Sequence, residues 1–515
     1  MTLLQWFIFF LIVQVVHFAG TWKLYEAAGR KRWEALVPIY NAIVLMKIIG
    51  RPTWWTILLF VPIVNLIMIP VVWVETIRSF GKNSTADTIL VLVTFGFYTY
   101  YINYTQKLEY ISDRSLVSPT KVGDTISSLL FAIVVATLVH TYVMQPFTIP
   151  TSSLEKSLLV GDFLFVSKFH YGARTPMTTV ALPMVHDTIP VLHKKSYMKW
   201  PQLPYFRFPA LQEIERNDIV VFNWPVDTVY KFFDRNGGRF DKPVDKKSNY
   251  VKRCVGIPGD SLSIKDGYVY NNGKLLVLPE RAKPQYSYMV TTNGGSFDPN
   301  YLLKELHITD GIYMDQRTPN TYIFSALTEE SAARIKSNPI VKSVVRNIDQ
   351  QPEQSVFPQN NKWNKDNFGP IYIPQEGKTV ALNAETLPFY KMIISDYENN
   401  DLKVNGNEIR INGKIATSYT FQQDYYWMMG DNRHNSEDSR YWGFVPENHI
   451  VGKPVFIWMS LDQHARGLDK IRWERMFTTV GGDGQPYSYF KFFLIALAAY
   501  FGITYFINKR KEQNS

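Results

Sequence analysis

Five uncharged apolar runs constrain this 515-residue chain more than any other feature, because four of them fall within the first 150 residues. A helix that crosses the hydrocarbon core of a bilayer needs roughly 20 mainly apolar residues, with about 17 as the lower limit. In chain order the runs are Leu3–Gly20, Trp54–Val74, Thr88–Asn103, Ile126–Phe147 and Phe492–Ile507. The third and fifth runs are borderline in length. We expect five membrane spans: an α-helical transmembrane N-terminal region and one C-terminal transmembrane helix.

Basic residues beside these runs predict the orientation of the chain. Such residues accumulate in short loops on the cytoplasmic side of a membrane. The first run is read as an uncleaved span rather than as a cleaved signal sequence, because no basic residue precedes it. Five spans then place the N-terminus outside the cell, the C-terminus inside, and the long segment between the fourth and fifth spans outside. The basic residues are Lys23, Arg30, Lys31, Arg32, Lys509, Arg510 and Lys511.

After residue 147 the pattern changes to short runs of β-branched and aromatic residues separated by Gly, Pro, Asn and Asp. Many short strands with such turns predict a mainly β, antiparallel domain. The candidate strands are Phe163–Phe169, Asp218–Trp224, Tyr250–Val255, Ser261–Ile264, Tyr268–Tyr270, Lys403–Ile411 and Val451–Trp458. Residues 298–367 indicate a surface insertion, and one or two helices are expected within Leu327–Asn347, around Pro339.

The predicted domains follow from these patterns. Residues 1–123 form a multi-span membrane region of unknown role, and residues 124–147 form an anchor helix. Residues 148–489 form an extracytoplasmic β-rich domain that carries the insertion at 298–367. Residues 490–515 form the C-terminal helix and its basic tail.

Charge and cysteine content exclude several classes of protein. The formal net charge is +10, but only 19% of residues are charged, and the basic residues are spread along the chain. A nucleic-acid binder concentrates basic residues in one patch, so no nucleic-acid partner is expected. The single cysteine, Cys254, excludes an intramolecular disulfide and a multi-cysteine metal site, and the nine histidines show no metal-ligand spacing. We expect no metal, no cofactor, and membrane lipid as a partner.

A small cluster of hydroxyl groups, Thr151, Ser152 and Ser153, follows the fourth apolar run. Pro146 and Pro150 prevent the membrane helix from continuing into this cluster. Ten extended residues reach at most about 36 Å, so Ser153 is expected close to the bilayer. Taken alone, the segment fits a polar turn after a membrane helix better than it fits a catalytic site.

Lys252 lies in the apolar run Tyr250–Val255, which ends in the turn Gly256–Asp260. A lysine with its ordinary pKa of about 10.4 is protonated and is no base at neutral pH. Burial disfavours the ammonium form and lowers that pKa. A serine activated by a lysine is an established peptidase arrangement that needs no histidine. For this segment alone, a lysine that points from a strand edge into solvent is the alternative.

A third segment, Gly430–Pro446, combines many polar residues with Tyr441-Trp442-Gly443-Phe444 directly after an apolar run. Together the three segments resemble the type I signal peptidases, membrane-bound Ser/Lys peptidases that remove leader peptides. The resemblance covers, in the order found in that family, Gln145–Lys168, Arg216–Trp224, Tyr250–Asp260 and Met429–Lys453.

The resemblance implies a role for each matching residue. Ser153 matches the nucleophile, Lys252 the general base, and Thr151 a hydroxyl that completes the oxyanion hole with the Ser153 N–H. It implies a bacterial signal peptidase I at the outer face of the cytoplasmic membrane. Its partners would be the signal peptides of exported preproteins, with small residues one and three positions before the cut.

Further positions match supporting roles in the family. Ser436 matches a serine that orients the lysine, and Asp438, Arg440 and Arg253 match a structural ion-pair network. The family commonly has Ser-Met-x-Pro-Thr-Leu at the nucleophile, whereas this chain has Ser153-Leu154-Glu155-Lys156-Ser157-Leu158. Lys156 is therefore a rival base, and Lys252 is preferred because its motif is intact. The alternative function is a catalytically inactive, membrane-anchored β-domain binding protein with the same fold.

Overall fold

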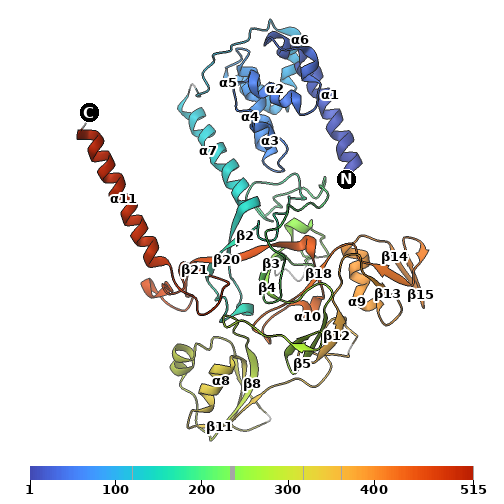
Figure 1. Cartoon of the computed structure of the whole chain (residues 1–515), viewed down its shortest axis with the longest axis vertical. Coiled ribbons are helices and arrows are strands. Elements are labelled where there is room, and N and C mark those ends of the chain that lie inside the picture. Colours follow the sequence, from blue (N-terminus) through green and yellow to red (C-terminus); the bar gives the residue numbers. More distant parts are fainter. Residues whose placement is uncertain (119, 232–237, 317, 361, 514–515) are drawn as a thin grey trace. The chain divides into compact units, whose positions relative to one another are not determined.

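The computed structural model describes residues 1–118, 120–231, 238–316, 318–360 and 362–513. It divides into two compact units (Figure 1). The helical unit comprises Met1–Val143, Ala173–Phe208 and Val229–Lys247. The β unit comprises Met144–Gly172, Pro209–Thr228 and Ser248–Ser515. Two segments of the predicted β-rich domain thus belong to the helical unit.

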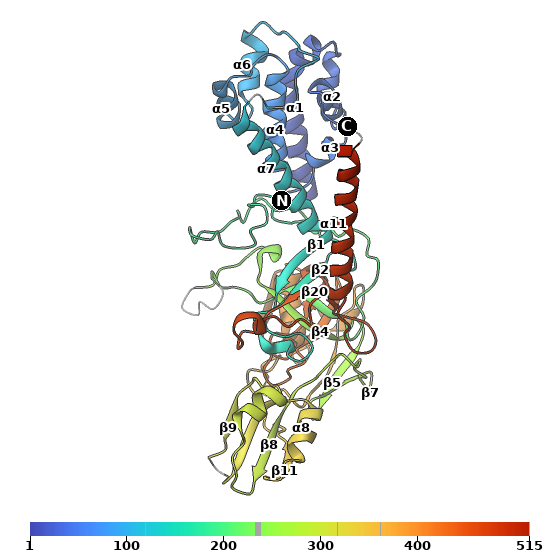
Figure 2. The ribbon, with the colours of Figure 1, turned by 90° about the vertical axis from the view of Figure 1, so that its left-hand side faces the viewer.

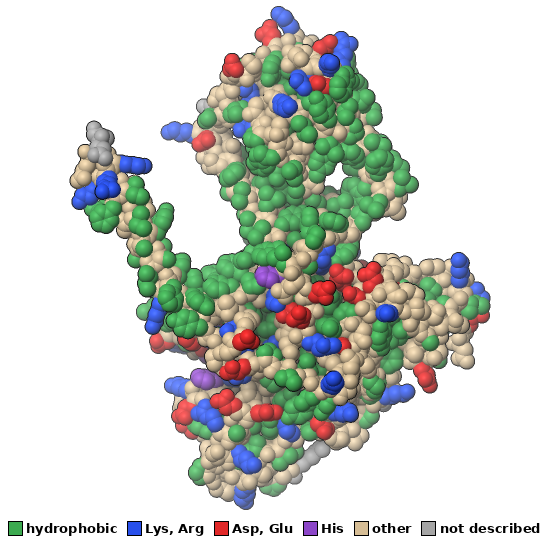
Figure 3. Space-filling view, viewed as in Figure 1, with side chains coloured by type: hydrophobic (Ala, Val, Ile, Leu, Met, Phe, Trp, Pro, Cys, Tyr) green, Lys and Arg blue, Asp and Glu red, His purple; other side chains and the backbone are tan. Residues whose placement is uncertain are grey.

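Three helices in the described part of the chain are long and apolar enough to cross a membrane. They are Leu3–Ala27 (α1), Lys121–Val143 (α7, Lys121–Leu138, continued by a π turn) and Phe490–Lys511 (within α11, Phe490–Gln513). In the apolar 18-residue stretch that qualifies each helix, at most 11% of the residues are buried within the protein. Hydrophobic side chains accordingly cover much of the visible face of the helical unit and line α11 (Figure 3). These three helices correspond to the first, fourth and fifth predicted spans.

The second predicted span, Trp54–Val74, does not form one helix. It breaks into α3 (Trp55–Leu58) and α4 (Asn65–Arg78). Pro62 lies in the break, and a proline at that position lacks the N–H that a continuous helix needs.

The third predicted span, Thr88–Asn103, is also broken. Its halves are α5 (Thr85–Val93) and α6 (Tyr98–Thr105), which meet at an angle of 117°. Between them Phe95 and Gly96 adopt positive φ angles of 51° and 83°, which ends the first helix. In the described part of the chain, three helices, or four if this bent pair counts as one, are long and apolar enough to be spans, and not the five that were predicted. The remaining helix of this region is α2 (Tyr40–Ile48).

The β unit is built on an eight-stranded sheet in the order β1-β2-β20-β3-β4-β18-β19, with β21 paired to β20. Each neighbouring pair in it is antiparallel, which confirms the predicted mainly β, antiparallel fold. The strands are β1 (Met144–Thr148), β2 (Asp162–Ser167), β3 (Ile219–Asn223), β4 (Asn249–Gly256), β18 (Tyr425–Met429), β19 (Val445–Pro446), β20 (Ile450–Ser460) and β21 (Thr478–Thr479).

Smaller antiparallel sheets complete this unit, in the orders β12-β5-β6-β7, β13-β17 and β14-β15-β16. The predicted strand Lys403–Ile411 is a hairpin of β14 and β15, because Gly406 turns the chain with a φ of 59°. The bounds are β5 (Ser261–Lys265), β6 (Tyr268–Asn271), β7 (Lys274–Leu275), β12 (Phe368–Tyr372), β13 (Thr379–Ala381), β14 (Leu402–Asn405), β15 (Glu408–Ile411), β16 (Lys414–Ile415), β17 (Ser418–Thr420), α9 (Leu387–Met392) and α10 (Ser439–Trp442).

The predicted insertion, residues 298–367, supplies β9, β10 and β11 to a four-stranded sheet in the order β11-β8-β10-β9, whose strand β8 precedes the insertion (Figure 2). Helix α8 packs on this sheet, and Phe324, Leu306, Ile308 and Ile335 lie in the shared core. One helix and one strand occupy the stretch for which one or two helices are expected. The bounds are β8 (Tyr286–Thr292), β9 (Ile312–Met314), β10 (Thr321–Leu327), α8 (Glu329–Lys336) and β11 (Val341–Arg346).

Candidate active site

Ser153 and Lys252 meet in the β unit although 99 residues separate them, and the Lys252 ammonium Nζ donates a hydrogen bond to Ser153 Oγ at 2.7 Å. Ser153 lies in the short 3-10 helix η3 (Ser152–Leu154), and Lys252 lies on β4. Their exposed fractions are 7% and 3%. Both side chains are therefore almost completely shielded from solvent by the surrounding protein.

The loop that carries Ser153 is anchored in the hydrophobic core by its own apolar residues. Leu154 and Leu158 are buried with Ile149, and these side chains pack against Leu164 of β2 and Ile457 of β20. Burying a leucine side chain contributes about 1.5–3 kcal/mol. The hydroxyl of Ser153 is thus positioned by anchors on both sides of it in the sequence.

The position of Lys252 on a doubly covered strand changes its acid–base chemistry. The last five residues of β4 are all buried, so both faces of the strand are covered. Burial lowers the pKa of Lys252 to about 8, although Asp438 and Glu437 favour its charged form. A substantial fraction of this amine is therefore neutral near pH 8 and can accept a proton.

The surroundings of Ser153 leave two hydrogen-bond donors free for a bound group. Within the described residues, neither the Ser153 N–H nor the Thr151 hydroxyl donates a hydrogen bond. Thr151 is exposed and extended, with φ −132° and ψ 154°, directly before η3. Both donors are thus available to a negative oxygen that forms beside Ser153 Oγ.

Two separate buried ion pairs lie near Lys252. Asp438 binds Arg440 through both oxygens at 2.8 Å, and it also accepts the Gly430 N–H at 3.0 Å. Against the opposing effect of burial, Arg440 holds the pKa of the Asp438 carboxyl below its usual range. Arg253 pairs instead with Asp431, at 2.8 and 2.6 Å.

Asp431 is a site residue that the sequence analysis did not single out. It accepts both bonds from Arg253 and a third from Ser157 Oγ at 2.5 Å, so it ties β4 to the segment after the nucleophile. A carboxylate directly after a glycine in the polar Gly430–Pro446 segment is the signal that would have identified it.

Ser436 lies beside Ser153, with Gly430 between them. A Cβ on Gly430 would stand 2.2 Å from Ser436 Oγ and 2.5 Å from the Ser153 carbonyl oxygen, so only glycine fits there. Ser436 Oγ contributes to the low pKa of the Asp438 carboxyl but forms no hydrogen bond of normal geometry with any described residue. The expected contact with Lys252 is not formed in this structure, and its orienting role stays a prediction.

Lys156, the rival base, is engaged elsewhere. Its Nζ donates to the carbonyl oxygen of His307 in the insertion. Its backbone φ of 70° lies in the left-handed region that non-glycine residues rarely adopt. Burial lowers its pKa, but of the two lysines only Lys252 contacts Ser153 Oγ.

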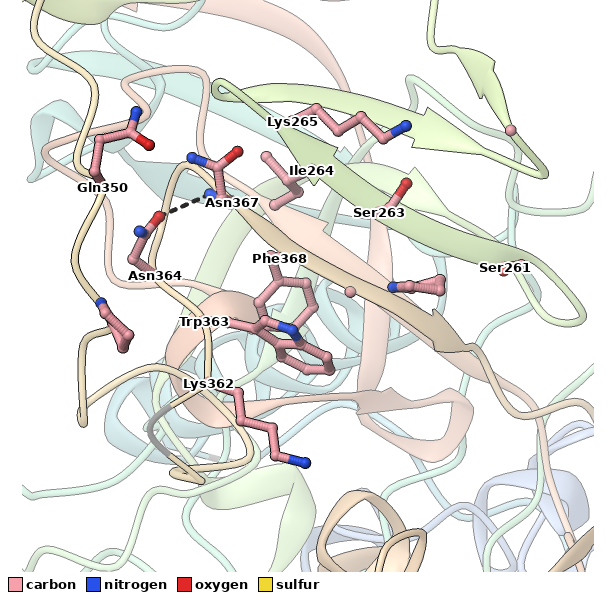
Figure 4. Close-up of a pocket in the computed structure, with 14 residues that line it drawn as sticks. Ser261, Ser263, Ile264, Lys265, Gln350, Lys362, Trp363, Asn364, Asn367 and Phe368 are labelled. Carbon is pink, nitrogen blue, oxygen red and sulfur yellow. Dashed lines mark hydrogen bonds between the residues drawn. The ribbon is translucent and has the colours of Figure 1, made fainter.

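A separate pocket of about 550 Å³ opens between β5, β12 and the chain from Gln350 to Asn364 (Figure 4). Trp363 packs on Phe368 in it with ring centroids 4.6 Å apart. The predicted site residues are absent from its described lining, so this pocket is not the dyad's cleft.

Two models of known protein families together match most of the chain. The family model described as "Signal peptidase, peptidase S26" matches residues 122–328 and 372–459, which is more than half of the chain. A second model, a family of unknown function (DUF5684), matches residues 33–113.

Curated relatives cover the same region. The signal peptidase I of Buchnera aphidicola (subspecies Baizongia pistaciae) is 24% identical over 66% of this chain and 78% of its own length. That of Haemophilus influenzae is 25% identical over 72% of this chain and 79% of its own. That of Helicobacter pylori strain 26695 is 26% identical over 69% of this chain and 92% of its own.

Proposed function

The chain belongs to the signal peptidase family, peptidase S26, and on that premise we propose that Ser153 and Lys252 are its catalytic dyad. Its function is that of a signal peptidase I, a membrane-bound peptidase. The observation that carries the dyad is the buried 2.7 Å hydrogen bond from Lys252 Nζ to Ser153 Oγ. Because nucleophile and base are both present and in contact, nothing favours the catalytically inactive alternative.

The geometry supports acyl transfer through a serine ester. Neutral Lys252 takes the hydroxyl proton as Ser153 Oγ attacks the scissile carbonyl carbon. The resulting oxyanion accepts hydrogen bonds from the Ser153 N–H and the Thr151 hydroxyl, and one such donor contributes about 3–4 kcal/mol. The Lys252 ammonium returns its proton to the leaving amine, and the neutral amine then activates the water that hydrolyses the ester.

The substrates proposed for this reaction are exported preproteins, cut after their signal peptides. Support comes from the curated relatives, each named signal peptidase I. By resemblance to the family, the residues one and three positions before the cut are small.

The proposed orientation places the β unit outside the cytoplasm. Three spans, like five, leave the two chain ends on opposite sides, with Lys31 and Arg510 both on the cytoplasmic side. Contacts within the helical unit support this. Trp6 near the start of α1 donates to the Gln202 carbonyl oxygen at 2.9 Å, and Tyr142 in the π turn that continues α7 contacts Phe208. The start of α1 and the end of α7 therefore lie on the same side.

Cleavage of a synthetic preprotein by the purified full-length protein tests the dyad. Ser153→Ala and Lys252→Ala are each expected to abolish cleavage, because each removes one reacting group. Ser337→Ala and Lys336→Ala, exposed substitutions near the end of α8, serve as matched controls and keep wild-type activity. An active Lys252→Ala protein beside an inactive Lys156→Ala protein would show that the base is misassigned.

A further inference from the structure

One carboxylate of the insertion, Asp310, binds two amides of the segment after β18 that in turn hold the loop of Ser153. Asp310 Oδ2 accepts a hydrogen bond from the Asn432 side-chain amide at 2.8 Å, and Asp310 Oδ1 accepts one from the Asn435 amide at 2.8 Å. We propose that Asp310 is a positioning residue for the reaction: it orients both amides, and the amides place the Ser152–Ser153 backbone. This inference rests on the proposed role of Ser153 as nucleophile.

The two amides that Asp310 binds also hold the residues around the nucleophile. Asn432 Nδ2 donates to the Ser152 carbonyl oxygen at 3.2 Å, and the Asn432 backbone N–H donates to the Ser153 carbonyl oxygen at 3.1 Å. Asn435 Nδ2 donates to Ser152 Oγ at 3.0 Å. Asp310 is therefore linked through one amide side chain to the Ser152–Ser153 segment, which positions Ser153 Oγ and the Ser153 N–H.

A carboxylate suits this position because it only accepts hydrogen bonds. Each amide must turn its NH₂ group toward Asp310, and the same NH₂ group then meets the Ser152 oxygens. Asn432 Oδ1 is buried and has no partner among the described residues, so its orientation is set by what its NH₂ group binds. Without the carboxylate, a flipped Asn432 would direct Oδ1 at the Ser152 carbonyl oxygen, which is repulsive.

Asp310 sits on a firmly held stretch of the insertion. Leu306 and Ile308, a few residues before it, are buried in the core beneath α8. His307 accepts the hydrogen bond from Lys156, three residues after the nucleophile. The stretch from His307 to Asp310 thus contacts the loop of Ser153 directly through His307 and Lys156, and indirectly through Asp310 and the two amides.

Steady-state kinetics of the full-length protein in detergent test the role. Asp310→Asn puts one NH₂ group against a neighbouring NH₂ group, so kcat is expected to fall by about 10–100-fold while KM changes little. Asp310→Glu keeps an acceptor-only carboxylate and is expected to recover much of the loss. Asp298→Asn, an exposed change on the same insertion, is the matched control.

Asn435→Ala guards against a misfolded Asp310 variant, since Asn435 is exposed and its loss leaves the insertion intact. It is expected to lower kcat without changing the melting temperature, and adding Asp310→Asn to it should cost less than Asp310→Asn alone. Wild-type kcat in Asp310→Asn or in Asn435→Ala, or a loss of kcat matched by a loss of folded protein, overturns the inference. An active Ser153→Ala protein would instead overturn the proposed function, whatever Asp310 does.

Discussion

Lys252, the proposed base, owes its acid–base chemistry to where its amine lies. Its pKa falls from 10.5 to about 8 through burial, because the opposing effect of the Asp438 and Glu437 charges is smaller than that of burial. Cleavage requires the neutral amine, so kcat/KM should rise with pH and reach half of its plateau at about pH 8. A pH–rate profile of preprotein cleavage checks this, and a profile flat from about pH 6 to 9 would contradict it.

The same burial has a cost in stability. Between about pH 8 and 10.5 the unfolded chain keeps a proton that folded Lys252 has released, so the free energy of unfolding rises with pH in this window. The shift is worth roughly 3 kcal/mol. Lys252→Met should therefore be inactive but at least as stable as wild type at neutral pH, and its stability should not rise through this window. Thermal unfolding of both proteins below and above about pH 8 measures this, and a strongly destabilised variant would contradict it.

The position of Gly430 has no room for a side chain. A methyl group there overlaps the Ser153 carbonyl oxygen and Ser436 Oγ, and the backbone at Ser153 must shift. Gly430→Ala is expected to lower the cleavage rate by roughly 100-fold or more, because a displacement of about 1 Å is enough for such a loss. Gly481→Ala, where a Cβ meets nothing within 4 Å, is the control. Equal rates for the two variants would refute the argument.

Among the structural elements, β4 and the segment after β18 are joined by the buried pair of Arg253 and Asp431. Asp431→Asn leaves the Arg253 guanidinium buried without a counter-charge, and destabilisation of about 3–5 kcal/mol is expected. Asp401→Asn removes the carboxylate of an exposed pair with Lys403 and should change stability by less than about 1 kcal/mol. Denaturant unfolding of the two variants compares them, and similar effects would show that the buried pair is not structurally important.

For the whole molecule, the predicted orientation can be read from labelling. The only native cysteine, Cys254, is buried, so an introduced cysteine gives a clean signal. A cysteine at Lys336 should react with a membrane-impermeant reagent in spheroplasts, and cysteines at Lys31 and Arg510 only after permeabilisation. If the cysteines at positions 31 and 510 reacted from opposite sides of the membrane, the bent pair α5–α6 would cross it as a fourth span.

Features that depend on local composition can be predicted from the amino-acid sequence. Apolar length predicts α1, α7 and α11 as spans, and alternating short runs predict an antiparallel β domain. The serine, the lysine and the polar segment after β18 are recognisable because their motifs are continuous in the chain. Local patterns suffice for these features because hydrophobic length and turn chemistry act over a few residues.

The pairing of groups that are distant in the chain depends on the three-dimensional fold. Arg253 meets Asp431 across 178 residues, and Asp310 meets Asn432 across 122. Strand register and the packing of the insertion determine these partners. The sequence alone does not identify them, because several carboxylates of the chain are chemically equivalent candidates for each pairing. The breaks at Pro62 and Gly96 likewise depend on packing, because an apolar run with one proline or glycine can either kink or turn back. Composition therefore predicts which residue types react, and three-dimensional packing decides which atoms touch.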